Sequence, residues 1–137
     1  MYTKINEKDS IMKLGAIYSK EKTTFTLFSP VADSVFVIFY DKGNDSTETG
    51  RLEMMRGEGE LRSIFSATAE GNLDGVYYTY EVHTADGTFS SHDPYARACG
   101  VNGHRSMVID LSKTDPDGFA DEDRPKLADP MSMVITE

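Results

Sequence analysis

The sequence has no tryptophan, a single cysteine and five prolines among its 137 residues. It also lacks any apolar run near the roughly 18 residues that a membrane-spanning helix needs, which excludes a helical membrane protein. The lone Cys99 excludes a disulfide within the chain. A chain of this length buries roughly 68% of its unfolded surface, so one domain can build a core without metals or disulfides.

Basic residues are scarce relative to acidic ones. There are 14 Lys and Arg against 23 Asp and Glu, which gives a formal charge of −9. Sequence-independent binding to nucleic acid and attraction to anionic membranes both depend on Lys and Arg, so neither partner is expected. The 39% hydrophobic and 27% charged residues are typical of a folded globular protein.

The N-terminal residues 1–10 mix both charge signs and lack the apolar stretch of a secretory signal. This favours a cytoplasmic location. Secretion stays open as the alternative, with an export signal removed upstream of Met1.

Motifs for catalysis and metal binding are also missing. The three histidines, His83, His92 and His104, do not follow metal-ligand spacings, and the acidic stretch 115–123 lacks the pattern of a calcium loop. Neither a GxSxG nucleophile motif nor a GxxxxGK phosphate loop occurs. We therefore expect no catalytic residue, no metal, no cofactor and no enzymatic activity from this chain alone.

Short alternating segments separated by turn residues dominate the pattern. Residues 23–28, 34–40, 61–67 and 76–82 alternate with the period of two that is typical of strands, and Asp86-Gly87 suits a type I′ hairpin turn. These features predict an all-β fold, an antiparallel Ig-like β-sandwich. Asp93-Pro94 predicts one helical turn. The stretch after residue 112 is rich in Pro, Asp and Gly and predicts an irregular linker, with a strand-like end at residues 133–136.

Aromatic side chains divide into two groups by their strand position. The core is the expected place for Phe25, Phe39, Phe65, Tyr78 and Tyr80. Three others, Phe28, Phe89 and Tyr77, are candidates for an outward position. Because the C–H faces of sugar rings stack on aromatic rings, outward aromatics on a sandwich are compatible with carbohydrate binding.

Three segments together carry a resemblance to a known family. LGAIYSKEKTTFTLFSPVADSVFVIFYD, GVYYTYEV and DPYARACGVNGHRSMVIDLSKTDPDGF resemble the N-terminal β-sandwich of type I pullulanases, carbohydrate-binding module family 48. The resemblance covers residues 14–137 and implies an N-terminal extension over 1–13 and the sandwich over 14–112. Residues 113–137 would be a linker and the start of a missing catalytic domain. The α-1,6-cleaving barrel of family 13 glycoside hydrolases, with its carboxylates, would follow Glu137.

The resemblance also implies site residues. Phe28 and Phe89 fall where related modules stack aromatics on glucose rings, Thr79 falls near a binding lysine that is missing here, and Tyr77 is a candidate for the rim. In those modules the stacking residues are tryptophans, which are replaced here by the smaller phenylalanine, and the lysine is missing, so the resemblance implies weak α-glucan binding or none. If both phenylalanines share one stacking surface, their rings should lie close together on one sheet face.

A second set of residues is implied for domain docking. Asp93, Pro94, Tyr95, Asn102 and Gly103 belong to the segment that resembles the joint between sandwich and barrel. The chain would then be either a glucan-binding module beside a catalytic barrel or a purely structural docking domain that binds no sugar. An unrelated Ig-like interaction module is the third reading.

Overall fold

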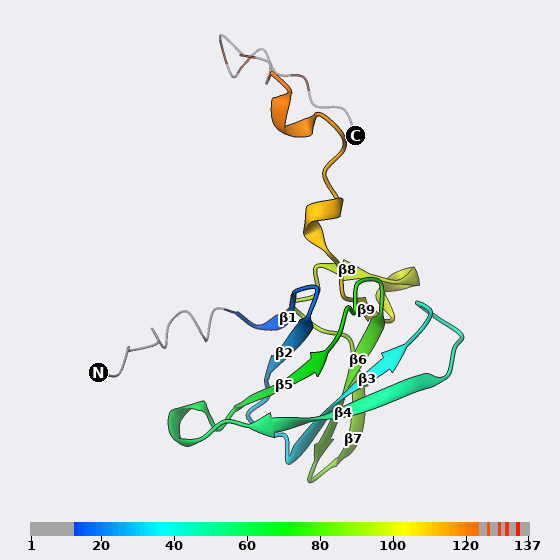
Figure 1. Ribbon diagram of the computed structural model, residues 1–137. Helices are drawn as coiled ribbons and strands as arrows, with labels where there is room; N and C mark the ends of the chain where they lie inside the picture. The colour runs from blue at the N-terminus through cyan, green and yellow to red at the C-terminus, as the bar shows by residue number, and fades with distance from the viewer. Residues whose placement is uncertain (1–12, 124–125, 127–128, 130, 132–133, 135–137) are drawn as a thin grey trace.

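The computed structural model describes residues 13–123 together with residues 126, 129, 131 and 134. No α-helix occurs among them. The described residues form nine strands and four single-turn 3₁₀ helices, two of which follow the last strand (Figure 1). The strands are β1 (Gly15–Tyr18), β2 (Lys22–Phe28), β3 (Ser34–Tyr40), β4 (Glu48–Arg56), β5 (Ile64–Glu70), β6 (Tyr77–Thr84), β7 (Gly87–Ser91), β8 (Ala98–Cys99) and β9 (Ser106–Met107). The 3₁₀ helices are η1 (Gly59–Leu61), η2 (Val101–Gly103), η3 (Leu111–Lys113) and η4 (Phe119–Asp121).

The strands form two antiparallel sheets that β4 joins. The first sheet has the order β1-β2-β5, and the second contains β3, β6 and the short strands β7, β8 and β9. Most of β4 pairs with β3, but Met55 and Arg56 at its end pair with β5. The predicted all-β antiparallel sandwich is confirmed.

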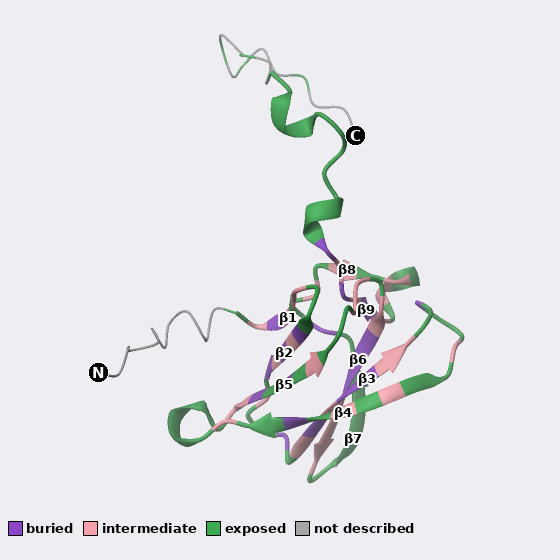
Figure 2. Cartoon of the chain, viewed as in Figure 1, coloured by how far each residue is buried: buried purple, intermediate pink, exposed green. Residues whose placement is uncertain are grey.

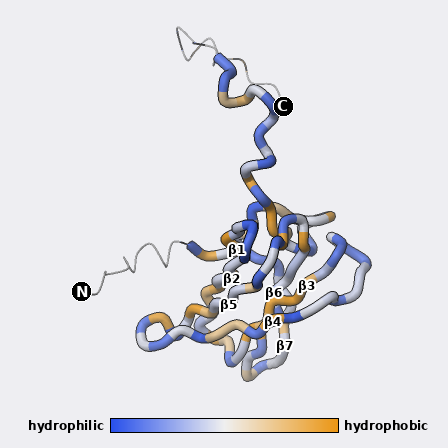
Figure 3. The backbone as a smooth tube through the Cα atoms, viewed as in Figure 1, coloured by the Kyte–Doolittle hydropathy of each residue, from blue (hydrophilic) through white to orange (hydrophobic). Residues whose placement is uncertain are grey.

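Aromatic rings fill the space between the sheets. Phe25, Phe65, Tyr78 and Tyr80 are buried, and Phe39 packs against them partly buried. The ring centroids of Phe25 and Tyr78 lie 5.0 Å apart in an edge-to-face arrangement, a favourable geometry for aromatic pairs. Buried residues follow β2, β3 and β6 in Figure 2, and β3 is hydrophobic over much of its length in Figure 3. The expected core positions are therefore confirmed.

Several local expectations need correction. The strand expected over 61–67 begins at Ile64, because η1 occupies the preceding residues. The β6–β7 hairpin exists, but its turn residues are Ala85 and Asp86 and neither has a positive φ, so type I′ is wrong. Gly87, with φ of 138°, is instead the first residue of β7.

The C-terminal part of the described chain leaves the sandwich. Residues 111–123 extend away from the end where β8 and β9 lie (Figure 1). The helical turn expected at Asp93 is a single turn, closed by the Ala96 N–H donating to the Asp93 carbonyl at 3.1 Å. The strand expected at 133–136 lies outside the described residues except for Val134.

Candidate functional site

The two predicted stacking residues are both exposed, but they lie on different sheets. Phe28 ends β2 and is 54% exposed, and Phe89 in the edge strand β7 is 55% exposed. Phe28 alternates with buried Phe25 and Leu27, so it is on the outer face of the first sheet. Phe89 pairs with Val82 and shares the core-facing side of the second sheet. The expected single stacking face is therefore not formed.

Tyr77 and Thr79 lie on the outer face of β6. Thr79 is only 6% exposed, and its Oγ1 lies 3.3 Å from the Tyr40 hydroxyl. The half-buried Tyr77 lies over the close approach of Gly43 and Gly100, where a Cβ on Gly100 would come within 2.7 Å of the Gly43 Cα. Thr79 thus has almost no surface to offer a sugar, whereas Tyr77 is only half-buried.

Arg105 completes this region and was missed by sequence reasoning. Its guanidinium carbon lies 3.6 Å from the centroid of the Tyr40 ring. The same group donates hydrogen bonds to the Lys42 carbonyl at 2.7 Å and to the Ser46 Oγ and carbonyl at 2.8 and 2.9 Å. No spacing rule relates Arg105 to Tyr40, so only the folded chain reveals the pair. The guanidinium therefore covers one face of the Tyr40 ring.

Charged side chains continue along this outer face. Arg51 donates to both carboxylate oxygens of Glu48, at 2.7 and 2.8 Å, and lies 3.4 Å from Glu81. His83 Nε2 is 2.9 Å from the same Glu81 oxygen. The hydrogen bonds from Arg51 hold the pKa of Glu48 below its ordinary value. We call this surface, with Phe36, Ile38 and Tyr40 on β3, the charged face.

Asp93 anchors the segment predicted to dock. It is 2% exposed, and its Oδ2 accepts hydrogen bonds from the hydroxyls of Tyr78 at 2.7 Å and Tyr80 at 3.1 Å. Its Oδ1 accepts the Tyr95 N–H at 2.8 Å, and its own N–H donates to the Ser106 Oγ. Burial, helped by the charge of Asp93, raises the pKa of both tyrosines above 10, so their hydroxyls stay donors. Asp93 therefore holds the segment in place and has no surface for a partner.

The other predicted docking residues lie at the surface around this anchor. Pro94, Tyr95 and Asn102 are exposed, and Gly103 is intermediate. Tyr95 packs so closely on β1 that a Cβ on Gly15 would meet its Cβ at 3.0 Å, and Gly15 has a φ of 93° that also favours glycine. Contacts with Gly15 of β1 and with Asp93 thus hold the segment against the sandwich, while the Tyr95 side chain stays exposed.

A polar cluster fixes the start of the C-terminal extension. Lys113 Nζ is 2.6 Å from Asp74, and the Asp74 carboxylate also accepts the Asp110 N–H at 2.8 Å. Asp110 in turn accepts the hydroxyl of Ser112 at 2.6 Å. The hydrogen bond from Lys113 lowers the pKa of Asp74, and that from Ser112 lowers the pKa of Asp110. These contacts tie residues 110–113 to the loop between β5 and β6.

The described residues contain neither a metal-binding cluster nor a membrane-spanning helix. No group of three or more His, Cys, Asp or Glu side chains that could hold a metal ion occurs in the described part of the chain. Within the same residues, no helix has the length and hydropathy needed to cross a membrane.

Comparison with known proteins places the chain in a family. The family model for carbohydrate-binding module 48, the isoamylase N-terminal domain, matches residues 13–96, more than half of the chain. The chain belongs to this family. The matched region contains β1 to β7, and therefore the first sheet, the second sheet without β8 and β9, the Asp93 anchor and both exposed phenylalanines.

Two bacterial pullulanases contain a segment that is similar in sequence to this chain. Pullulanase A of Streptococcus pneumoniae serotype 4 is 31% identical over 116 residues, which cover 80% of this chain but 9% of that protein. The pullulanase of Bacillus subtilis is 30% identical over 71% of this chain and 13% of its own length. This carbohydrate-binding module 48 chain thus spans about a tenth of the curated relatives that it matches.

Solved structures of pullulanases contain a domain with a similar fold. The pullulanase from Bacillus acidopullulyticus superposes with a TM-score of 0.75 at 35% identity, over 86% of this chain and 14% of that one. The pullulanase from Paenibacillus barengoltzii, in complex with maltohexaose and α-cyclodextrin, superposes with a TM-score of 0.77 at 34% identity, over 86% and 18%.

Proposed function

We propose that this chain is a non-catalytic accessory module that binds or positions α-glucan weakly beside the catalytic barrel of a pullulanase-type debranching enzyme. The observation that supports this most directly is the pair of exposed phenylalanines, Phe28 and Phe89, in a member of a carbohydrate-binding family. Maltohexaose in the complex of a similar pullulanase makes a linear α-glucan the natural ligand to test.

The geometry supports low affinity. Phe28 and Phe89 lie on different sheets, so a short glucan would stack on one ring at a time. Beside Thr79, at the predicted lysine position, Tyr77 is half-buried and the ring of Tyr40 is covered by Arg105. A binding free energy near −4 kcal/mol corresponds to a Kd of about 1 mM, which we expect for single stacking contacts at an open surface.

Titration with maltoheptaose tests the proposal. Backbone amide shifts should move near Phe28 or Phe89 with a Kd of about 1 mM. Phe28→Ala or Phe89→Ala should abolish the shifts, depending on which ring binds. Phe119→Ala is the matched control, because Phe119 is similarly exposed at 58% but lies in η4 on the extension. Micromolar binding, or binding that survives both substitutions, would contradict these sites.

Domain docking is a second candidate function, favoured by the anchored segment around Asp93. Tyr95 is exposed two residues after Asp93, whose carboxylate and backbone N–H are hydrogen-bonded within the sandwich. Such a fixed, partly apolar surface suits contact with a barrel, through Pro94, Tyr95, Asn102 and Gly103. A chain that shows no amide shifts with maltoheptaose at about 10 mM would favour this function over glucan binding.

A further inference from the structure

Strand β7 forms a free edge of the second sheet (Figure 1). Its residues Gly87–Ser91 pair with β6 on one side, and all of them are exposed. On the other side of β7, no strand of the described part of the chain pairs with it. A free edge presents backbone N–H and C=O groups that can pair with another chain.

The hydrogen bonds of β6 determine which backbone groups of β7 point outward. The His83 carbonyl accepts the Asp33 N–H at 2.7 Å on the β3 side of β6, so the pair of His83 with Thr88 is not a hydrogen-bonded pair. Hydrogen-bonded and non-hydrogen-bonded pairs alternate along an antiparallel ladder. The backbone N–H and C=O of Phe89 therefore point toward β6, whereas those of Thr88 and Ser90 point to the free edge. No hydrogen bond between described residues engages these outward groups.

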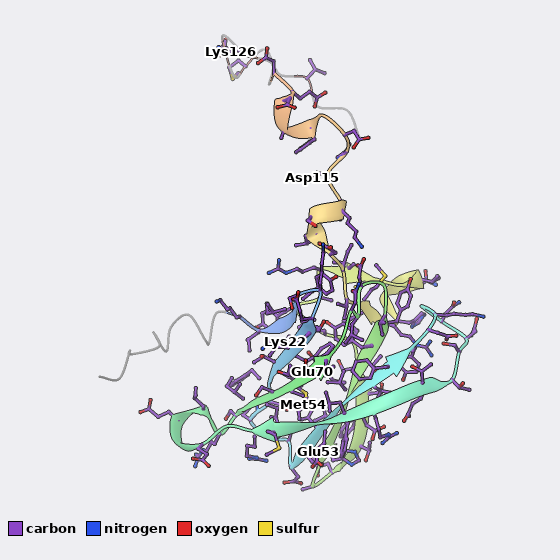
Figure 4. The ribbon with its side chains drawn as sticks, in the orientation of Figure 1. Lys22, Glu53, Met54, Glu70, Asp115 and Lys126 are labelled. Carbon is purple, nitrogen blue, oxygen red and sulfur yellow. The ribbon has the colours of Figure 1, made fainter. Side chains whose placement is uncertain are left out.

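β7 also lacks the features that protect the other edges. It contains no charged residue, no proline and no shift in its register with β6. The part of β4 that pairs only with β3 carries Glu48, Arg51 and Glu53, the last of which is labelled in Figure 4. Beside β1 stand residues 109–112, which line a cleft of about 230 Å³ together with it. Because charged side chains and covering segments are what prevent edge-to-edge pairing, β7 is the edge that stays open to a partner.

The sequence around β7 is complementary to itself in the antiparallel direction. When Phe89 stands opposite Phe89 of a second copy, Thr88 stands opposite Ser90, and each outward N–H meets an outward C=O. The same register places the exposed Asp86 opposite the exposed His92 at both ends of the ladder. A carboxylate accepts hydrogen bonds, and an imidazole always has an N–H to donate. A shift of two residues, the smallest that keeps the outward groups paired, separates the phenylalanines and also separates Asp86 from His92.

We propose that β7 is the contact strand of a symmetric dimer, in which the β7 strands of two copies of this chain pair antiparallel about a two-fold axis at Phe89. A two-fold interface uses the same patch on both copies, so it requires the self-complementary sequence that β7 has. The two Phe89 residues form a non-hydrogen-bonded pair, where side chains lie closest, and each ring covers the other. The inference does not require that the module bind glucan.

The size and charge of the contact make the dimer weak. A strand of five residues is about 17 Å long, so the buried surface falls below the roughly 1,200 Å² of stable complexes. The formal charge of −9 on each copy also opposes association, although salt at about 0.15 M screens charges that lie more than about 8 Å apart. We therefore expect a transient dimer with a Kd of about 0.2 mM.

Sedimentation equilibrium of the 137-residue chain between about 0.02 and about 1 mM tests the proposal, and the average mass should rise from one copy toward two. Ser90→Pro should raise the Kd at least about tenfold, because it removes an outward N–H and leaves the hydrogen bonds to β6 in place. Phe89→Lys should have the same effect, because it places like charges opposite each other. Phe28→Lys is the matched control, since Phe28 is as exposed as Phe89 but lies on the first sheet, and its Kd should not change.

Disulfide trapping measures the register directly. In a Cys99→Ser background, Phe89→Cys places two thiols opposite each other with a Cα separation of about 4.5 Å, which a disulfide can span. Thr88→Cys is the control, because the two copies of that position would be diagonal neighbours about 8 Å apart, beyond the reach of a disulfide. With oxidised glutathione as the oxidant, Phe89→Cys should form the cross-linked dimer at least about tenfold faster than Thr88→Cys.

Several results would overturn the proposal. A mass that stays at one copy up to about 1 mM means that the edge is not used. Association that persists in Ser90→Pro and Phe89→Lys places the contact elsewhere, and species larger than two copies contradict a closed two-fold dimer. Equal cross-linking rates for the two cysteine variants contradict the register. The urea midpoint of each variant is measured first, and if Ser90→Pro is unfolded, Phe89→Lys and the disulfide rates decide.

Discussion

The two outer faces of the sandwich differ in how far their apolar side chains are exposed to solvent. On the charged face, Ile38 is 3% exposed although it points away from the core between the sheets. On the outer face of the first sheet, Phe28 and Met55 are exposed. Both faces follow the same strand alternation, so the difference comes from the neighbouring side chains. Arg51 pairs with Ile38 in register and is long enough to cover it, whereas Thr26 and Ser66 cannot cover Phe28 or Met55.

The largest effect that separates the two faces is the cost of truncating an apolar side chain. Ile38→Ala should lower the free energy of unfolding by about 3 kcal/mol, because it removes buried methyl groups and leaves a cavity. Phe28→Ala should change it by less than about 1 kcal/mol, because most of that ring is already in water. Urea denaturation of the 137-residue chain measures both values. Equal costs would show that the two faces are covered alike.

A second expected effect is the loss of stability when Arg105, which covers the Tyr40 ring, is replaced. Arg105→Ala removes the cation over the Tyr40 ring and three hydrogen bonds to the loop between β3 and β4. We expect a loss of about 2 kcal/mol in the free energy of unfolding. Arg105→Lys should recover less than half of it, because one ammonium group cannot reproduce the planar fork. Full recovery with lysine would mean that charge alone matters here.

The fold could be predicted from the sequence where the strand pattern is strongest. The alternation of apolar and polar residues in these strands predicts a core, and Phe25, Val35, Val37 and Tyr78 are indeed buried in it. The pattern fails at β4, because Glu48–Arg56 contains three charged residues in its first six and Gly50. That strand is stabilised by its pairing with β3 and β5 and by the packing of Arg51 over Ile38 on the charged face. Both are tertiary contacts, which the local sequence does not contain.

The candidate site was less predictable for a related reason. The sequence identifies Phe28 and Phe89 as outward residues, but the face on which each lies depends on which strands pair, and that is a long-range property. Thr79 looked accessible on an alternating strand, yet Tyr40 buries it from a different strand. Arg105 is 65 positions from Tyr40, too distant for any local rule to connect them.

The smallest effect is the pH dependence that the ion pairs of the charged face produce. Arg51 holds the pKa of Glu48 below its ordinary value of 4.5, so the ionised carboxylate is favoured in the folded state. This contribution to stability is present above pH 4.5 and is lost as the pH falls through the lower pKa of the folded chain. Arg51→Met should therefore shrink the difference between the urea midpoints at about pH 7 and about pH 3.

Lys22→Met at the start of β2 is the matched control for that substitution. Lys22 is exposed like Arg51, but no salt bridge within 4.0 Å joins it to another described residue. Its removal should leave the pH dependence of the urea midpoint unchanged, apart from a uniform shift due to net charge. Acid titration of Asp74 and Asp110 occurs in all three chains and cancels in the comparison. A change as large for Lys22→Met as for Arg51→Met would mean that overall charge sets the acid response, and that the ion pairs of the charged face contribute nothing specific.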